Sequence, residues 1–193
     1  MKGAGPDLLR PASGTAMDST VDSVQDHPAA MLRRTARLAL RPPRPADLDF
    51  VVDLFSRPEL VAHRPHPEPD TPEASATRLE RDMVHWQRHC FGRWAIERDG
   101  NLIGFGGLTR KAGFEGLNLS YHLHPAAWGR GYASELAAEA LAVAFGPLAA
   151  WKVIGLVRPA NPASRRVLER AGFVPEAEVV LEGAPSLLLA RYP

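Results

Sequence analysis

The sequence contains little cysteine, no long apolar run and almost no net charge, and each of these absences excludes a class of protein. A single cysteine, Cys90, forms no internal disulfide and no multi-cysteine metal site. The 23 basic and 22 acidic residues give a formal charge of +1, which argues against a nucleic-acid partner held by bulk charge. No segment approaches the roughly 18 apolar residues of a membrane span, and charged residues interrupt every candidate signal-peptide core. We therefore expect a cytoplasmic protein without membrane contact.

The length and the apolar content indicate one ordinary domain behind a flexible tail. A chain of 193 residues that is 45% hydrophobic suffices for one core. Residues 1–30 are rich in Gly, Pro, Ser, Thr and Asp and lack apolar periodicity, which is typical of a segment that does not order itself. We therefore assign residues 1–30 to a tail and residues 31–193 to the domain.

Periodicity and turn residues within the domain predict both strands and helices. Apolar spacing favours helices at 48–55, 72–88, 132–145 and 162–171. Alternating patterns favour strands at 37–41, 93–98, 102–110, 116–124, 151–158, 173–180 and 186–192. The second and third of these strands are joined by an Asp-Gly turn, and alternating prolines keep residues 63–69 out of regular structure. A strand meander followed by β-α-β-α-β indicates a mixed sheet of the α/β or α+β class.

The segment between the strand at 116–124 and the helix at 132–145 favours an anion site. It carries Gly129 and Gly131, whose backbone N–H groups can approach a ligand closely, and the helix N-terminus adds partial positive charge. Phosphate is the natural occupant. The spacing lacks the last glycine of the dinucleotide fingerprint and the ending of a P-loop, so a nucleotide-binding module is the weaker interpretation. A tight strand-to-helix turn without a ligand is the plain alternative.

Four segments taken together resemble the GNAT N-acetyltransferases. Residues 128–133 (WGRGYA) are similar to the pyrophosphate-binding motif of that family. Residues 161–173 (NPASRRVLERAGF) are similar to its asparagine-containing helix and Gly-Phe signature. Residues 104–108 (GFGGL) and 121–135 (YHLHPAAWGRGYASE) look most like the RimJ/RimL-like branch, the ribosomal-protein-alanine acetyltransferases. The resemblance covers about residues 31–193.

This resemblance implies a fold, a cosubstrate and a class of acceptor. The fold would be a mixed, mostly antiparallel sheet with flanking helices, splayed between the strand that ends at His124 and the strand that ends at Arg158. Acetyl-CoA would donate the acetyl group to a primary amine, either a protein N-terminus or a small molecule, by direct attack and without a metal. The family resemblance also allows a homodimer, although no interface can be located from the sequence.

The resemblance also implies which residues would hold acetyl-CoA. The pantetheine would pair with the backbone of Tyr121, His122 and Leu123 in the manner of an added strand, and an N–H of that strand would polarise the thioester carbonyl. Asn161 would position a pantetheine amide, and Ser164 would lie near the sulfur. The pyrophosphate would bind backbone N–H groups in the glycine loop, namely those of Gly129, Arg130, Gly131, Tyr132 and Ala133.

The catalytic acid and base are less evident, because this chain departs from the family pattern at both positions. Many relatives carry a tyrosine acid where this chain has Leu168, so we assign the acid role to Ser164, whose alternative role is an N-cap hydroxyl for the helix at 162–171. A glutamate base is common where this chain has Asn118. We therefore take His122 as the candidate base, since a histidine pKa near 6.5 suits proton transfer.

Other residues compete with these assignments, and a different function competes with catalysis. His124 shares a strand face with His122, and Glu97 on the hairpin is a further candidate base or a solvent-facing residue. His85 and His89 have the spacing of two metal ligands on a helix but no third ligand, so we expect no metal. The absent acid and base leave one alternative open, a non-catalytic acyl-CoA-binding module or sensor with the same fold.

Overall fold

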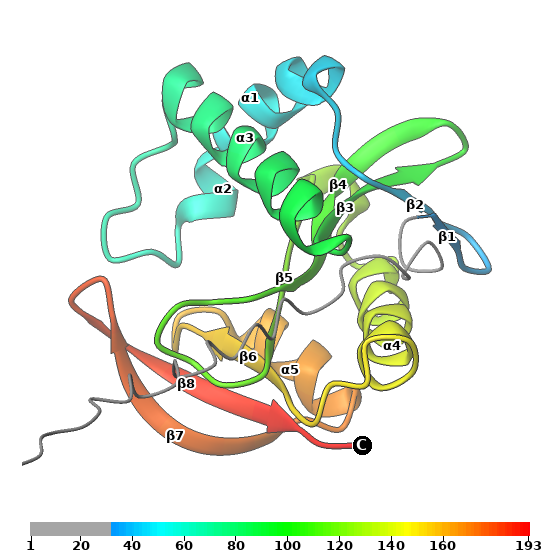
Figure 1. The fold of residues 1–193 in the computed structure, drawn as a ribbon. Coiled ribbons are helices and arrows are strands. Elements are labelled where there is room, and N and C mark those ends of the chain that lie inside the picture. Colours follow the sequence, from blue (N-terminus) through cyan, green and yellow to red (C-terminus); the bar gives the residue numbers. More distant parts are fainter. Residues whose placement is uncertain (1–31) are drawn as a thin grey trace, which may run out of the picture.

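A mixed sheet of eight strands is the centre of the structure (Figure 1). The computed structural model describes residues 32–193, so the tail predicted at 1–30, and Met31, lie outside the described residues. The strands are β1 (Arg33–Arg34), β2 (Ala39–Arg41), β3 (Arg93–Arg98), β4 (Asn101–Thr109), β5 (Leu117–Leu123), β6 (Val153–Val157), β7 (Val174–Leu181) and β8 (Ala184–Arg191). Their order in the sheet is β1-β2-β3-β4-β5-β6-β8-β7. Only β5 and β6 pair in parallel, which confirms the predicted mixed, mostly antiparallel sheet.

The sheet separates between β5 and β6. These strands pair at only two positions, Leu117 with Val153 and Asn118 with Ile154. Beyond these pairs, the remaining residues of β5 stay on β4 and those of β6 stay on β8. A gap therefore opens toward the C-terminal ends of both strands. This is the splayed sheet that the family resemblance predicts.

Helices cover both faces of the sheet. Helices α1 (Leu48–Phe55), α2 (Pro58–Val61) and α3 (Pro72–His89) lie together, and α4 (Tyr132–Phe145) and α5 (Pro162–Arg170) lie on the other side (Figure 1). Successive strand residues point to opposite faces. Ala95 and Phe105 accordingly pack with α1, α2 and α3, whereas Trp94 and Ile96 pack with α4. None of the helices within residues 32–193 combines the length and the apolar character needed to cross a bilayer.

A glycine in β4 lets α4 pack close to the sheet. A Cβ atom on Gly106 would lie 2.6 Å from Cδ2 of Leu136 in α4 and 2.6 Å from Cβ of Tyr121 in β5. Such distances are far below ordinary van der Waals contact, so a larger residue would push the helix away. Because α4 begins at the glycine loop, this contact also fixes the distance between that loop and the sheet.

Most elements agree with the predictions, and the differences have simple causes. The helix predicted at 132–145 is confirmed at both ends by α4. The strand predicted at 37–41 begins only at Ala39, because the preceding residues form a turn in which the Thr35 N–H donates to the Leu38 carbonyl. Helix α2 was not predicted, since four residues are too few to show a helical period.

A buried ion pair connects β2 to the start of α1. Arg41 donates from Nη1 and Nη2 to the two carboxylate oxygens of Asp47, at 2.9 and 2.7 Å, and from Nε to Glu97 at 2.7 Å. Asp47 also accepts from the Arg44 N–H at 2.7 Å, and only 4% of the residue is exposed. A carboxylate buried this deeply needs its partners, so removal of one leaves an uncompensated charge.

We expect Asp47→Ala to lower the free energy of unfolding by about 3 kcal/mol, because the Arg41 guanidinium would stay buried without its main counter-ion. Urea denaturation followed by circular dichroism measures this. Asp49→Ala, an exposed change two residues along the chain, is the matched control and should change stability by less than about 0.5 kcal/mol. Equal effects of the two changes would contradict a structural role for the buried pair.

Candidate active site

Two adjoining cavities meet where β5 and β6 separate. One, of about 390 Å³, lies between the end of β5, the loop after it and the start of α5. The other, of about 600 Å³, lies between α3, β5 and β6. Both are lined by His63, Tyr121, His122, Asn161 and Ser164. Four of these five residues are candidates from the sequence, so the fold brings residues from β5 and α5 to one place.

The loop between β5 and α4 presents unpaired backbone N–H groups. Gly129 and Gly131 have φ angles of 71° and 78°, a left-handed conformation that glycine adopts without a Cβ penalty. Within residues 32–193, the N–H groups of 129–133 donate to no protein acceptor. Gly131 is also the N-cap of α4, so the partial positive charge of the helix N-terminus adds to that of these groups. The loop can therefore bind an anion such as a phosphate.

A salt bridge that the sequence analysis missed holds this loop. The Arg37 guanidinium donates to Oε2 of Glu135 at 2.7 Å and to the Arg130 carbonyl at 2.9 Å. Oε1 of Glu135 accepts from the Arg37 N–H at 2.8 Å and from the Thr35 hydroxyl. The turn before β2 is thereby fixed to the first turn of α4 and to the loop. Nothing in the local pattern indicates this pairing, because Arg37 and Glu135 are distant in sequence.

Successive side chains of β5 point to opposite faces of the sheet beside the gap. The Tyr121 hydroxyl reaches α5, where it donates to the Ser164 carbonyl at 3.4 Å. His122 points the other way, and its ring lies edge-on to Phe55 of α1 with 5.0 Å between the ring centroids. The Leu123 carbonyl accepts from the Trp128 indole N–H at 2.7 Å, so this indole is held by the protein beside the glycine loop.

His122 is held in its neutral form. Burial lowers its pKa well below the usual 6.5, and the positive charges of Arg93, Arg78 and Arg64 lower it further. Its Nδ1 atom is buried and has no hydrogen-bond partner within the described part of the chain. A neutral imidazole in this place can accept a proton from a bound group.

Asn161, and not Ser164, caps the N-terminus of α5. Asn161 is the N-cap, and its Oδ1 accepts from the Ser164 N–H at 3.1 Å. The alternative role of Ser164 as an N-cap hydroxyl is therefore wrong, because the asparagine already fills it. The Ser164 side chain is left on the wall shared by both cavities.

The position of the usual acid is occupied by core packing. Leu168 is 2% exposed and belongs to the main hydrophobic cluster, so α5 offers no acid there. Tyr121 is the nearest phenol that the structure brings to Ser164, and burial raises its pKa above the usual 10. The Tyr121 hydroxyl therefore keeps its proton at neutral pH and can donate it.

The two competing base candidates, Glu97 and His124, and Asn118 at the position of the usual glutamate are all engaged in other contacts. Asn118 is buried, and its amide lies 3.5 Å from the Thr109 hydroxyl. Glu97 faces away from the gap, since it pairs with Arg41 on the opposite side of β4. His124 caps the turn after β5 by accepting from the Ala126 N–H at 3.1 Å. The solvent-facing role considered for Glu97 is thus replaced by a salt bridge.

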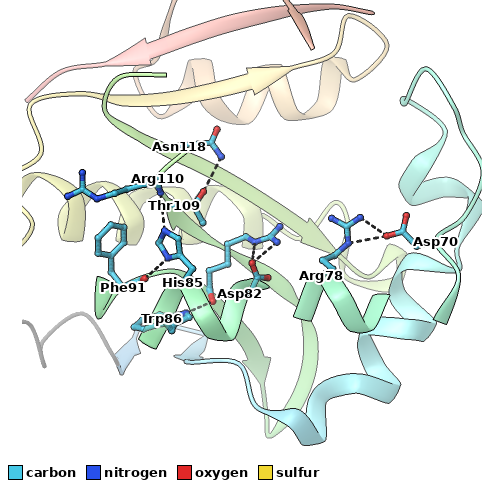
Figure 2. A network of polar contacts seen from close by, with 10 residues as sticks. Asp70, Arg78, Asp82, His85, Trp86, Phe91, Thr109, Arg110 and Asn118 are labelled. Carbon is cyan, nitrogen blue, oxygen red and sulfur yellow. Dashed lines mark hydrogen bonds and ion pairs between the residues drawn. The ribbon is translucent and has the colours of Figure 1, made fainter. Parts of the chain in front are cut away.

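His85 of the histidine pair on α3 hydrogen-bonds the segments on either side of it. Nδ1 of His85 lies 2.8 Å from the Phe91 carbonyl, and its Nε2 accepts from the Arg110 N–H at 3.1 Å (Figure 2). Both ring nitrogens are therefore occupied. Over residues 32–193, no group of three or more His, Cys, Asp or Glu side chains is arranged to hold a metal ion. Cys90 lies at the C-cap of α3, outside both cavities.

Comparisons with known proteins agree with this geometry. The acetyltransferase (GNAT) domain family matches residues 37–174. An uncharacterised N-acetyltransferase of Bacillus subtilis, YoaA, is 26% identical over 147 residues, which are 74% of this chain and 82% of YoaA. A GNAT-family acetyltransferase structure from Bordetella pertussis has a TM-score of 0.71 and 25% identity, covering 83% of this chain and 99% of its own. RimJ of Mycobacterium smegmatis, in complex with CoA-disulfide, has a TM-score of 0.68 and 22% identity, covering 83% and 85%.

The chain belongs to the GNAT acetyltransferase family and is an acetyl-CoA-dependent acyltransferase. The matching structures include RimJ and other members of the family. The predicted fold, with its separation between β5 and β6, is that of the family.

Acidification should destabilise the protein through His122. In the unfolded chain this imidazole titrates near pH 6.5, whereas its folded pKa is far lower, so the unfolded state binds more protons as the pH falls below 6.5. From pH 7 to pH 5 this group alone removes up to about 2 kcal/mol of stability. Urea unfolding at pH 7, 6 and 5 should therefore show a smaller loss for His122→Phe than for the unmodified chain. The same dependence on pH in both proteins would contradict burial of a neutral imidazole.

Loss of the salt bridge behind the glycine loop should weaken cosubstrate binding. Glu135→Gln removes the charge that orients Arg37, so we expect acetyl-CoA to bind about tenfold more weakly, or about 1.4 kcal/mol. Calorimetric titration measures the change. Glu139→Gln is the matched control, since Glu139 lies one turn further along α4 and pairs with Arg33, away from the loop. Equal affinities of the two variants would show that the salt bridge does not order the loop.

Proposed function

We propose that the protein transfers the acetyl group of acetyl-CoA to a primary amine by direct attack of the amine on the thioester. The observation that carries this proposal is the continuity of the site. The unpaired N–H groups of residues 129–133, the open edge of β5 and the cap of α5 all border the 390 Å³ cavity or the loop beside it. This is an elongated path that begins at an anion site and ends at titratable side chains.

The residues along this path fit acetyl-CoA from one end to the other. The N–H groups of Gly129, Arg130, Gly131, Tyr132 and Ala133 would hold the pyrophosphate. The backbone of Tyr121, His122 and Leu123, which does not pair with β6, would bond the pantetheine amides as a neighbouring strand would. The Oδ1 atom of Asn161 caps α5, which leaves its Nδ2 amide for the pantetheine.

The reacting groups would meet where the two cavities join. Acetyl-CoA supplies an activated thioester, so the amine nitrogen forms a C–N bond as the C–S bond breaks. A backbone N–H of β5 stabilises the negative charge that develops on the carbonyl oxygen. Ser164, and the Tyr121 hydroxyl beside it, supply the proton that the leaving thiolate takes up.

The amine must lose a proton to become an amide, and His122 is the group placed to accept it. It lines both cavities, its imidazole is neutral, and its Nδ1 has no protein partner among the described residues. Only a neutral amine is a nucleophile. The lowered pKa of His122 makes it a weak base, so we assign it the relay of the proton to solvent.

The cytoplasmic location, the RimJ/RimL-like branch and the homodimer stay predictions.

Binding and turnover test the proposal separately. Calorimetric titration should show tight binding of acetyl-CoA and CoA, and weak or no binding of ATP and NAD. Gly131→Glu should abolish this binding by the strain of a left-handed φ and by repulsion of the phosphates. Gly100→Glu is the matched control, because Gly100 has a φ of 79° and open space around it at the tip of the β3–β4 turn. No CoA binding by the folded protein would overturn the proposal.

Turnover distinguishes an enzyme from a non-catalytic acyl-CoA-binding module. Release of CoA from acetyl-CoA in the presence of amines should be lost or fall at least tenfold in Ser164→Ala/Tyr121→Phe and in His122→Phe, while acetyl-CoA still binds. A protein that binds acetyl-CoA and acetylates no amine would be the binding module instead.

A further inference from the structure

The larger cavity is strongly basic although the whole chain is nearly neutral. Of the charged residues that line its 600 Å³, two are acidic, Asp82 and Glu182. The basic ones are Arg64, Arg78, Arg81, Arg93, Arg110, Lys111 and Arg158. The formal charge of +1 over 193 residues gives no hint of this concentration. Because the cavity opens beside His122 and Ser164 and lies next to the proposed acetyl-CoA cavity, it is the place from which an acceptor would reach the thioester.

We propose that the acceptor is an amine that also carries a carboxylate or a comparable anionic group, and that the arginines of this cleft bind this group. This inference rests on the proposed function. Guanidinium groups recognise carboxylates through paired N–H donors. The same charges would repel a polyamine, which adds positive charge with each additional amino group. The proposal therefore selects one part of the broad class of primary amines.

Asp70 holds two of the arginines side by side. Oδ1 of Asp70 accepts from Nη1 of Arg64 at 2.6 Å, and its Oδ2 accepts from Nε and Nη2 of Arg78 at 3.0 and 2.5 Å. One carboxylate thus balances two guanidinium groups, so a net positive charge remains. The guanidinium carbon of Arg78 also lies 4.2 Å from the centre of the Phe55 ring, which packs against His122. These contacts fix the Arg78 side chain close to the candidate base.

Arg93 is the second fixed arginine. Its Nε and Nη2 donate to Oδ1 of Asp82 at 3.0 and 2.7 Å, and both side chains are largely buried. Figure 2 shows Arg78, Asp82 and His85 in a row along α3, with Thr109 and Asn118 of the neighbouring strands across from them. A guanidinium has five N–H donors, and these pairings use two on Arg78 and two on Arg93. The remaining donors on each have no acceptor within residues 32–193, and both side chains line the cleft.

The rim of the cleft carries cations with no internal partner. The side chains of Arg81, Arg110 and Lys111 are exposed and make no ion pair within residues 32–193. Exposed charges of this kind contribute more to attraction of a charged ligand than to stability. Arg158, on the far wall, is held by the carbonyls of Leu181 and Ala184, at 2.8 Å each, and by Glu182. The excess positive charge of the cleft therefore lies mainly on the side that carries Arg81, Arg110 and Lys111, because Glu182 balances Arg158.

The positive field of this cleft reaches the point of transfer. Arg93, Arg78 and Arg64 are the charges that, after burial, lower the pKa of His122. An ammonium group bound beside His122 would experience the same field, so its pKa would fall and more of it would be the neutral nucleophile. An anionic group on the acceptor would lie against the arginines while its amine lies near the thioester. This arrangement also accounts for proton removal without a glutamate base.

Matched acceptors test the proposal directly. The peptides Ala-Glu-Glu and Ala-Gln-Gln, both amidated at the C-terminus, share an N-terminal amine of similar basicity and differ only in charge. 4-Aminobutyrate and 4-aminobutanamide form a second pair, and spermidine is the cationic probe. With saturating acetyl-CoA, we expect kcat/KM to be at least tenfold higher for the acidic member of at least one pair, mainly through KM, and spermidine to be the poorest acceptor. The preference should shrink as NaCl rises from 50 to 500 mM.

Charge-removing variants connect the preference to the cleft. Arg78→Gln and Arg93→Gln should each reduce the ratio of the two kcat/KM values at least fivefold, and Arg78→Lys should restore part of it. Because these changes leave a buried aspartate with fewer partners, Arg81→Gln/Arg110→Gln provides a variant that disturbs no internal pair and should also lower the ratio. Arg88→Gln, an exposed change on the same helix outside the cleft, is the matched control and should leave it unchanged.

The outcomes separate this inference from the proposed function. Equal rates for charged and neutral acceptors, or a preference for spermidine, would overturn the anionic acceptor and leave the acetyltransferase intact. A gain in rate with succinyl-CoA in place of acetyl-CoA, without a preference for acidic acceptors, would assign the anionic group to the acyl donor and overturn the inference as stated. A folded protein that binds acetyl-CoA and acetylates none of these acceptors, nor any other amine, would overturn both.

Discussion

The short pairing between β5 and β6 is the constraint on which the whole site depends. Only two residue pairs join these strands, so the later part of β5 has one backbone edge on β4 and the other on the gap. Backbone N–H and C=O groups that are shielded from water need partners. A ligand that carries amide groups along its length can satisfy such an edge, and the cap of α5 supplies a further amide opposite it. The glycine loop and the basic cleft then border two ends of one opening.

The rigidity of the glycine loop comes from outside the loop. Its left-handed glycines adopt the loop conformation without strain, but glycine adopts other conformations equally well. Arg37 and Glu135 stabilise this one conformation. Their hydrogen bonds connect the Arg130 carbonyl and the first turn of α4 to the turn before β2. Close packing of Leu136 over Gly106 holds the same helix on the sheet. Binding groups that are already in place need less ordering when a ligand arrives.

The sequence permits prediction of features that depend on local pattern. The apolar stripe of α4 and its flanking glycines determine both ends of that helix, and the motif at 128–133 locates the glycine loop. The Asp-Gly turn between β3 and β4 is confirmed for the same reason, since it needs only a few neighbouring residues. The cap of α5 was considered for Ser164, but Asn161 fills it, because an asparagine side chain before the first turn can cap a helix as well as a serine can.

Features that join distant segments could not be predicted in this way. The pairing of Arg37 with Glu135 brings together ordinary charged residues whose positions only the tertiary structure relates. Glu97 gave no sign that Arg41 would engage it. The basic cleft is the strongest example, because its arginines come from α3, β3, the end of β6 and two loops, and each in isolation resembles a solvated surface residue.

The two hydrogen bonds of His85, which lines the larger cavity, fix a single tautomer of its imidazole. Its Nε2 accepts from the Arg110 N–H, so the ring proton must reside on Nδ1, which donates to the Phe91 carbonyl. One tautomer therefore joins the C-terminal part of α3 to the end of β4. A second proton would set two N–H donors against each other, and burial already disfavours it by lowering the pKa. The alignment of the arginine-bearing helix with the sheet is thus tied to a single imidazole tautomer.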